Sequence, residues 1–368
     1  MRTLSLRQLN RATLARQHLL ERAALPLPKM VELLAGLNAQ DRRQPYVSLW
    51  SRLQGFRKAD LEQALRDRRL VKATLLRSTL HIVTARDFLL MRPALQPVLE
   101  RALRSFFKEE ARRLPLDALV EEARRLTAEA PVTFGEMRAR LRPLAPDEDP
   151  ASLSFAARAY LPLVQLPPAG DWGFTGDPSY FSGEAWLGRP MGDPADGRRR
   201  LVLRYLRAFG PATEADVTAW AGMSLKEALD RLRPRLVEYR GPAGEKLWDL
   251  PGMPLPPEDC PAPVRFLPPW DNLLLSHRDR RRVLPEAYRP RVIWSGGRVQ
   301  PTVLVDGWVA GLWRWEREGG RARLVVESFE RLPSWVLDEV EAEGRALLAF
   351  LQEDAEHAEV VVRPQAPA

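Results

Sequence analysis

The stretch RRRLVLRYLRAFGPATEADVTAWAGMSLKEALDRLRPRLVEYRGPAGEKLWDL, residues 198–250, decides the expected fold. Apolar residues recur there with helical period in three short segments, and two strand-like segments follow around a Gly-Pro-Ala-Gly tip. Thr213 and Ser224 precede the second and third segments, where a side-chain oxygen caps a helix. This order is typical of a winged helix-turn-helix, whose third helix commonly enters a DNA groove. The expected helices are 198–209, 214–222 and 224–233, and the expected hairpin is 235–250.

A first copy of the pattern lies near the N-terminus. Segments 70–77 and 78–84 are rich in β-branched residues and are expected to pair as strands. Thr84 is expected to cap the next helix, which Pro93 and Pro97 break. The expected helices are 5–21, 27–37, 44–53, 58–68 and 85–113.

A second, weaker copy lies in the middle of the chain. Thr133 is expected to cap its second helix, and residues 164–174 are the candidate wing. Residues 177–197 lack helical or strand period, which predicts a linker. The expected helices of this copy are 116–130, 134–142 and 152–163.

The composition changes after residue 250. Residues 251–270 are proline-dense, so we expect an extended segment on the surface. Alternating segments with glycine turns then predict a small β-rich domain, a partly closed barrel with one helix. The expected strands are 291–298, 301–316, 322–330 and 357–364, and the expected helix is 332–354.

Charge and composition limit the class of protein. The net charge of +8 favours a polyanionic partner such as nucleic acid. One cysteine excludes an internal disulfide, and four dispersed histidines show no metal-ligand spacing. No apolar run approaches the length of a membrane span, and the polar start of the chain does not resemble a signal peptide. No phosphate-binding glycine loop is present, so we expect neither cofactor nor metal, and a cytoplasmic, nucleoid-associated protein.

The segment GLNAQDRR, residues 36–43, is the best candidate for chemistry. Gly36 can end the preceding helix, and on an extended chain Asn38 and Gln40 point to one side while Ala39 points into the core. Two neighbouring amides can orient a water or hold a phosphate, and the basic pair Arg42 and Arg43 follows. The same amides can equally cap a helix and line a turn, and the pattern leaves both interpretations open.

Five stretches of the chain resemble the AlkZ/YcaQ-type bacterial DNA glycosylases. They span almost the whole chain in the order of that family. The resemblance implies tandem winged helices and a C-terminal β domain in a C-shaped clamp, and hydrolysis of the N-glycosidic bond of alkylated purines, in some members of interstrand crosslinks. The stretches are LLAGLNAQDRRQPYVSLWSRLQGFRKADLEQAL (33–65), LLRSTLHIVTARDF (75–88), FGPATEADVTAWAGM (209–223), VRFLPPWDNLLLSHRDRRR (264–282) and VLVDGWVAGLWRW (303–315).

The family's catalytic triplet, typically Gln-x-Gln or Gln-x-Asp, falls on Asn38-Ala39-Gln40. Asn38 departs from the commoner first glutamine by one methylene, which concerns the lesion and the rate more than the presence of a site. An alkylated purine already carries positive charge, so a protein that places a water against an oxocarbenium-like sugar supplies what the reaction needs. Our hypothesis is that Asn38 and Gln40 hold this water. Asp41 is a rival base, although an extended chain turns it away from Gln40.

Two further groups are candidate DNA contacts. Arg77, Thr79 and His81 alternate along 70–84 and are expected to share one strand face, either near the nucleotide with Arg77 on a phosphate or in a half-buried hairpin. Trp270 and Asp271 match an aromatic–Asp pair of the family, and Trp270 either stacks on a base or plugs a domain junction. The clusters Arg278 to Arg282 and Arg198 to Arg200 are backbone-contact candidates or solvated faces, and Arg278 is the first choice.

Together these features predict a monomeric, monofunctional DNA glycosylase of α+β class acting on double-stranded DNA with alkylated purines. No lysine stands in the triplet region, so strand cleavage through a Schiff base is not expected. The alternative is a non-enzymatic winged-helix DNA-binding protein, either a regulator or an architectural protein. A stable dimer in solution would favour the regulator. The expected domains are 1–90 with the triplet, 91–185, 186–255 and the β-rich domain 256–368.

Overall fold

The third copy of the pattern folds as three helices followed by a two-stranded wing. The structure, a computed structural model, describes residues 2–167 and 178–364. Thr213 and Asp216 form a reciprocal capping box, which confirms the predicted helix start. The next helix begins two residues after Ser224, whose hydroxyl accepts a hydrogen bond from Lys226 N. The elements are α11 (Pro194–Phe209), α12 (Glu214–Ala221), α13 (Lys226–Leu232), β7 (Val237–Arg240) and β8 (Lys246–Asp249).

The first copy contributes the central body and the candidate triplet. Its two main strands are antiparallel and are joined by a 3₁₀ turn, η1 (Leu76–Ser78), in place of the continuous strands that we expected. The predicted helix break near the two prolines is confirmed, because α5 ends and α6 begins around Leu95. The elements are α1 (Leu6–Arg16), α2 (Leu27–Leu33), β1 (Leu37–Asn38), α3 (Gln44–Trp50), α4 (Lys58–Arg66), β2 (Leu70–Thr74), β3 (Leu80–Thr84), α5 (Ala85–Ala94) and α6 (Gln96–Arg113).

The second copy shares a sheet with the first. Six strands are hydrogen-bonded in the order β1-β3-β2-β5-β6-β4, so strands from both copies form one surface. The prediction of a linker over 177–197 was wrong, because its described part contains β6 and α10. Residues 168–174 of the candidate wing lie outside the described residues. Pairing of β6 with both β5 and β4 overrides the weak local pattern. The elements are α7 (Leu116–Glu129), β4 (Val132–Thr133), α8 (Phe134–Leu141), α9 (Pro150–Tyr160), β5 (Leu163–Gln165), β6 (Ser179–Ser182) and α10 (Gly183–Leu187).

The C-terminal part is an open sheet covered by one long helix. Its five strands run in the order β15-β14-β13-β12-β9, and no pairing between β9 and β15 among the described residues closes it into the expected barrel. Strand β15 is parallel to β14, with α16 as the crossover between them. The elements are β9 (Arg265–Leu267), α14 (Asn272–Leu275), α15 (Arg289–Val292), β10 (Ile293–Trp294), β11 (Arg298–Val299), β12 (Thr302–Val305), β13 (Trp308–Glu318), β14 (Arg321–Ser328), α16 (Ser334–Leu351) and β15 (His357–Pro364).

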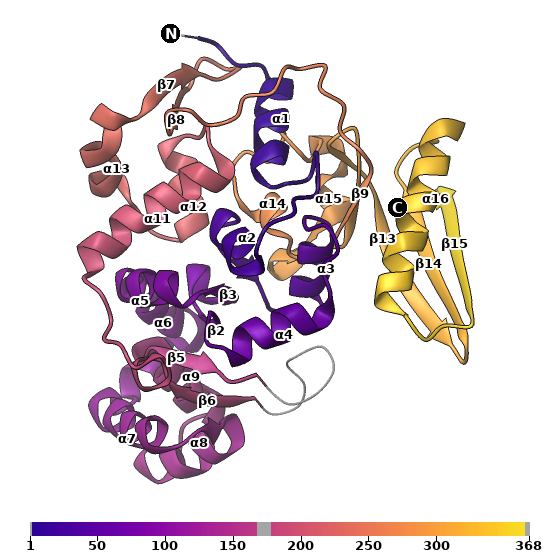
Figure 1. Ribbon diagram of the computed structural model, residues 1–368. Coiled ribbons are helices and arrows are strands. Elements are labelled where there is room, and N and C mark those ends of the chain that lie inside the picture. Colours follow the sequence, from indigo (N-terminus) through magenta and orange to yellow (C-terminus); the bar gives the residue numbers. More distant parts are fainter. Residues whose placement is uncertain (1, 168–177, 365–368) are drawn as a thin grey trace.

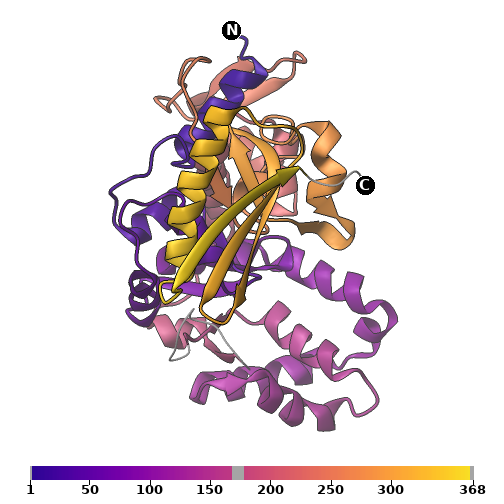
Figure 2. The same ribbon diagram turned by 90° about the vertical axis from the view of Figure 1, so that its right-hand side faces the viewer.

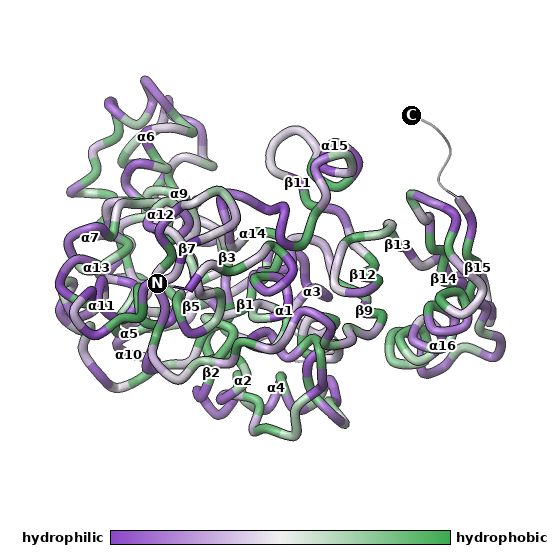
Figure 3. The backbone as a smooth tube through the Cα atoms, turned by 90° about the horizontal axis from the view of Figure 1, so that it is seen from above, coloured by the Kyte–Doolittle hydropathy of each residue, from purple (hydrophilic) through white to green (hydrophobic). Residues whose placement is uncertain are grey.

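Two lobes extend from the central body. The helices α7 and α8 lie at the lower end of the molecule, and α16 with β14 and β15 forms an arm at one side (Figure 1). The view turned by 90° shows the same lower lobe and arm (Figure 2). From above, the arm stands beside the body and is joined to it through β13 and its neighbours (Figure 3). The predicted α+β class is confirmed, and the use of these lobes as a DNA clamp stays a prediction.

The arm is anchored on the first copy by apolar packing. Val47 of α3 is buried in one cluster with Phe266 of β9 and Val303 of β12. The segment between β9 and α14 therefore lies against the helix that follows the triplet.

In the parts of the chain that the structure describes, none of the helices combines the length and the apolar character that a membrane crossing requires.

Candidate functional site

The candidate triplet follows a tight helix end. Gly36 has a φ of 94°, and its N–H donates to Val31 O at 2.9 Å, which completes the end of α2 as the sequence predicts. A Cβ at this position would lie 2.8 Å from Val83 Cγ1 and 3.2 Å from Ile82 O. Only glycine therefore lets the chain turn directly from α2 into β1.

The two amides of the triplet lie on one side of the chain, as predicted. Ala39 packs with Leu37 in the core of the first copy, so Asn38 and Gln40 face the other way. Asn38 is 3% exposed, whereas Gln40 is exposed to solvent. The structure thus presents one buried and one accessible amide from adjacent positions of the same face.

Backbone contacts fix the orientation of both amides. Asn38 Oδ1 accepts from Gln40 N at 3.1 Å, and Gln40 Oε1 accepts from Leu80 N at 3.0 Å. Each oxygen keeps a second lone pair, and neither side-chain NH₂ donates to another described residue within hydrogen-bond distance. The pair therefore offers donors and acceptors to a water or to DNA without losing its internal anchors.

Asp41 lies on the opposite side from the amides. Its carboxylate accepts from Arg43 N at 2.9 Å and interacts electrostatically with Lys72. Lys72 is paired with Ile82, whose register partner is Leu37, so Lys72 shares the face of Leu37. Burial lowers the pKa of Lys72 to about 8, and the nearby Asp41 opposes this shift. This geometry disfavours both Asp41 as the base for a water on the Asn38 side and Lys72 as a nucleophile there.

His81 is the register partner of Asn38 on the neighbouring strand. It is 1% exposed, and its Nδ1 lies 3.0 Å from Thr79 O, which requires Nδ1 to donate. Burial, reinforced by Arg77, lowers the pKa of His81 to about 3. His81 is therefore neutral at physiological pH, and as the register partner of Asn38 it lies on the same face of the sheet.

The expectation that Arg77, Thr79 and His81 share one strand face was wrong. The φ values of Arg77 and Ser78 are 51° and 60°, so the chain turns between β2 and β3. Arg77 Nη1 donates to Trp220 O at 2.5 Å, which ties this turn to α12 of the third copy. Burial and nearby Arg280 lower the pKa of Arg77 to about 10. A phosphate contact by Arg77 would have to compete with this internal bond.

Of the basic pair after the triplet, one arginine faces solvent and the other contacts β13. Arg42 is exposed. The Arg43 guanidinium lies 4.5 Å from the ring centroid of Trp315 in β13, and burial lowers its pKa. Arg42 is thus the freer of the two for a phosphate, and Arg43 links the site to the arm.

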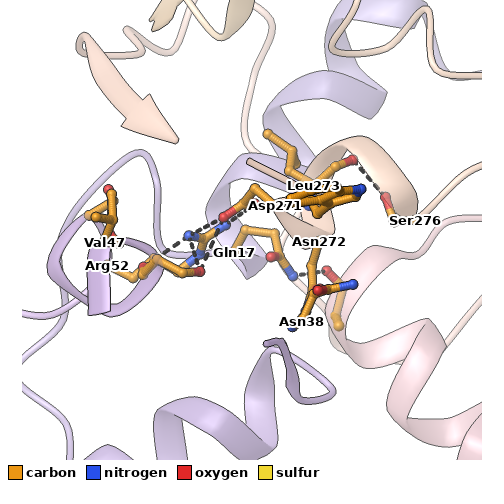
Figure 4. Close-up of polar contacts among 12 residues, drawn as sticks. Gln17, Asn38, Val47, Arg52, Asp271, Asn272, Leu273 and Ser276 are labelled. Carbon is orange, nitrogen blue, oxygen red and sulfur yellow. Dashed lines mark hydrogen bonds and ion pairs between the residues drawn. The ribbon is translucent and has the colours of Figure 1, made fainter. Parts of the chain in front are cut away.

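The Trp270–Asp271 pair lies beside the triplet, but its hydrogen bonds are to other residues of the protein. Trp270 Nε1 donates to Gly297 O at 3.0 Å, and Trp270 O accepts from Gln44 Nε2 at 2.8 Å, as expected of a junction plug. The Asp271 side chain is 0% exposed and accepts from Arg52 Nη2 at 2.7 Å and Nη1 at 3.0 Å. The predicted DNA contact of Asp271 is therefore corrected to an internal ion pair, which Figure 4 shows together with neighbouring Asn272.

Sequence reasoning missed Asn272, although it stands inside a stretch that resembles the family. Its side chain reaches both Gly36 and Asn38 on the far side of β1 from β3. The separation of more than 230 positions between Asn272 and the triplet left no sequence signal for their contact.

Of the arginines that follow Asn272, Arg278 remains exposed, whereas Arg282 is buried and Arg281 pairs with Asp279.

The second arginine cluster lies away from the triplet. Arg198 and Arg199 line a hollow of about 450 Å³ with Arg231 and Arg235, between α11 and α13. Neighbouring acids offset part of this charge, since Arg231 pairs with Glu227 at 2.6 Å. The structure does not bring this cluster together with the triplet residues.

The chain is similar to one protein family in sequence and to a solved structure in fold. A model of the family described as DNA glycosylase AlkZ-like matches residues 31–350. Among solved structures, the chain is similar to the Streptomyces sahachiroi DNA glycosylase AlkZ, with a TM-score of 0.79 and 22% identity over 99% of this chain and 100% of that chain. At this identity the likeness concerns the fold. A comparison with curated proteins finds no match.

Proposed function

The chain belongs to the AlkZ-like family of DNA glycosylases, and from this premise we propose that it is a monofunctional glycosylase for alkylated purines in double-stranded DNA. The observation that carries the proposal is the pair of anchored amides, Asn38 and Gln40, on one side of β1. Membership of a family of DNA glycosylases favours an enzyme over a non-enzymatic DNA-binding regulator.

The proposed chemistry needs little from the protein. An N7- or N3-alkylated purine leaves with its positive charge neutralised, and the sugar passes through an oxocarbenium-like state. Gln40 and Asn38 hold the attacking water through the free lone pairs and NH₂ groups of their amides. Orientation of this kind lowers the barrier because the water is already placed against the anomeric carbon.

In the part of the chain that the structure describes, the buried lysine nearest the amides in sheet register lies on the other face, which supports hydrolysis without strand cleavage. Lys72, the buried lysine closest in sheet register, lies on the Leu37 face with Asp41 as its electrostatic partner. A Schiff base with the sugar requires a lysine on the Asn38 face. We therefore expect base release to leave an intact abasic strand.

The shorter first amide bears on the lesion. Asn38 ends one methylene earlier than the glutamine common in the family and is almost fully buried. A side chain shorter by one methylene occupies less space than a glutamine would, so we expect this site to accept a bulkier N7 substituent. Bulky adducts and crosslinks are the substrates to compare with N7-methylguanine.

The test is base release from duplexes that carry N7-methylguanine or a bulky N7 adduct. Gln40→Ala and Asn38→Ala are each expected to slow release by about 100-fold with DNA binding retained. Asp41→Asn, which changes the neighbouring side of the chain, is the control and should keep most activity. Release that survives both alanine variants but not Asp41→Asn would move the site to Asp41, and no release from either duplex would refute the proposed activity.

A further inference from the structure

Among the described residues, the strand that carries Asn38, β1, pairs with a single strand, β3. Strand β1 is two residues long and lies at the end of the sheet order, next to β3. Ala39 N donates to Leu80 O at 2.8 Å on the β3 side. Gly36 O and Asn38 N point to the other edge, where an edge strand leaves its peptide groups without a neighbouring strand. A strand this short needs a partner on that edge to keep a fixed geometry.

Asn272 supplies this partner with its side chain. Its Oδ1 accepts from Asn38 N at 3.3 Å, and its Nδ2 donates to Gly36 O at 2.5 Å. A carboxamide carries the donor and acceptor of one peptide group, so it replaces one unit of the missing strand. We propose that Asn272 is a positioning residue that holds Asn38 and Gln40 in register, an inference that rests on the proposed glycosylase function.

The backbone around Asn272 is fixed by bonds to the same part of the chain. Asp271 caps α14 through Leu273 N at 3.0 Å and is held by Arg52 and by Ser48 Oγ at 3.1 Å. The Asp271 side chain is 0% exposed, so bulk water does not compete for the hydrogen bonds of its carboxylate. The side chain of Asn272 thus extends from a rigid turn that is tied to α3, the helix following the triplet.

The residue type is specific for this arrangement. Aspartate has the shape of asparagine but brings only oxygens, so it would face Gly36 O with no donor and repel it. Alanine removes both bonds and leaves Asn38 N without a partner. Alanine therefore frees both groups on the outer edge of β1, whereas aspartate loses the bond to Gly36 O and can still accept from Asn38 N. In both variants the inner edge keeps its bond from Ala39 to Leu80.

The experiment compares Asn272→Ala and Asn272→Asp with Asn10→Ala. Asn10 is the matched control because it is a buried asparagine that donates to two distant carbonyls, Arg282 O at 2.6 Å and Gly307 O at 2.8 Å, without touching β1. Hydrogen exchange at Asn38 N is read by mass spectrometry. In parallel, single-turnover base release and DNA affinity are measured for each protein.

Asn272→Ala is expected to raise exchange at Asn38 by about tenfold, whereas Asn272→Asp, which keeps an acceptor for Asn38 N, should raise it less. Both variants are expected to slow base release by about 10- to 100-fold, with DNA affinity within twofold of the parent. Asn10→Ala should change neither exchange at Asn38 nor the rate. Unchanged exchange in Asn272→Ala overturns the contact, and faster exchange with an unchanged rate overturns the positioning role. If the parent releases no base, the glycosylase proposal fails separately, while the exchange result still decides whether Asn272 holds β1.

Discussion

The ion pair between Arg52 and Asp271 makes a sharp prediction about stability. Both side chains are at most 1% exposed, and the carboxylate accepts two hydrogen bonds from the guanidinium. Replacing Asp271 with alanine leaves the Arg52 charge buried and unpaired, which costs about 3–5 kcal/mol of unfolding free energy. Arg52→Met leaves the carboxylate unpaired in the same way, with a similar cost.

The double variant Arg52→Met/Asp271→Ala should be more stable than either single variant. Neither charge of this pair remains buried in it, so the remaining loss is the cap of α14, about 1 kcal/mol, and the hydrogen bonds of the pair to Ser48, about 1 kcal/mol each. Urea unfolding of the parent and the three variants, followed by far-UV circular dichroism at one pH, measures the four values. Losses that simply add in the double variant would refute the assignment of a coupled buried pair.

Two further predictions concern protons and DNA. Burial lowers the pKa of His81 and of His277 to about 3, so the unfolded chain binds more protons between about pH 6.5 and pH 3 and stability falls as pH drops through that window. From pH 7 to pH 5.5 the loss is about 1 kcal/mol for each histidine, and an unfolding midpoint that stays constant over this range contradicts the burial argument. Arg42→Ala should make the negative slope of log affinity against log salt less steep by about 1. Arg345→Ala on α16, whose guanidinium pairs with Glu341, should leave the slope unchanged. Equal slopes for the two variants would argue against an Arg42 phosphate contact.

Local patterns predicted much of the fold. The helices and wing of the third copy, the cap at Thr213 and the break between α5 and α6 all follow from residue period, capping chemistry and proline. The helix end at Gly36 and the alternation of Asn38, Ala39 and Gln40 are also local, and both are confirmed. These features depend on neighbours within a few positions, which is why the sequence by itself determined them.

The tertiary structure alone decided what surrounds the triplet. The joining of β2 to β5, the strand in the expected linker and the internal roles of Arg77 and Asp271 depend on contacts between distant segments. The clearest case is Asn272, which completes the outer edge of a two-residue strand from 234 positions away. Periodicity cannot indicate such a partner, because an unpaired peptide group is satisfied by whichever side chain the packing of the whole molecule brings to it.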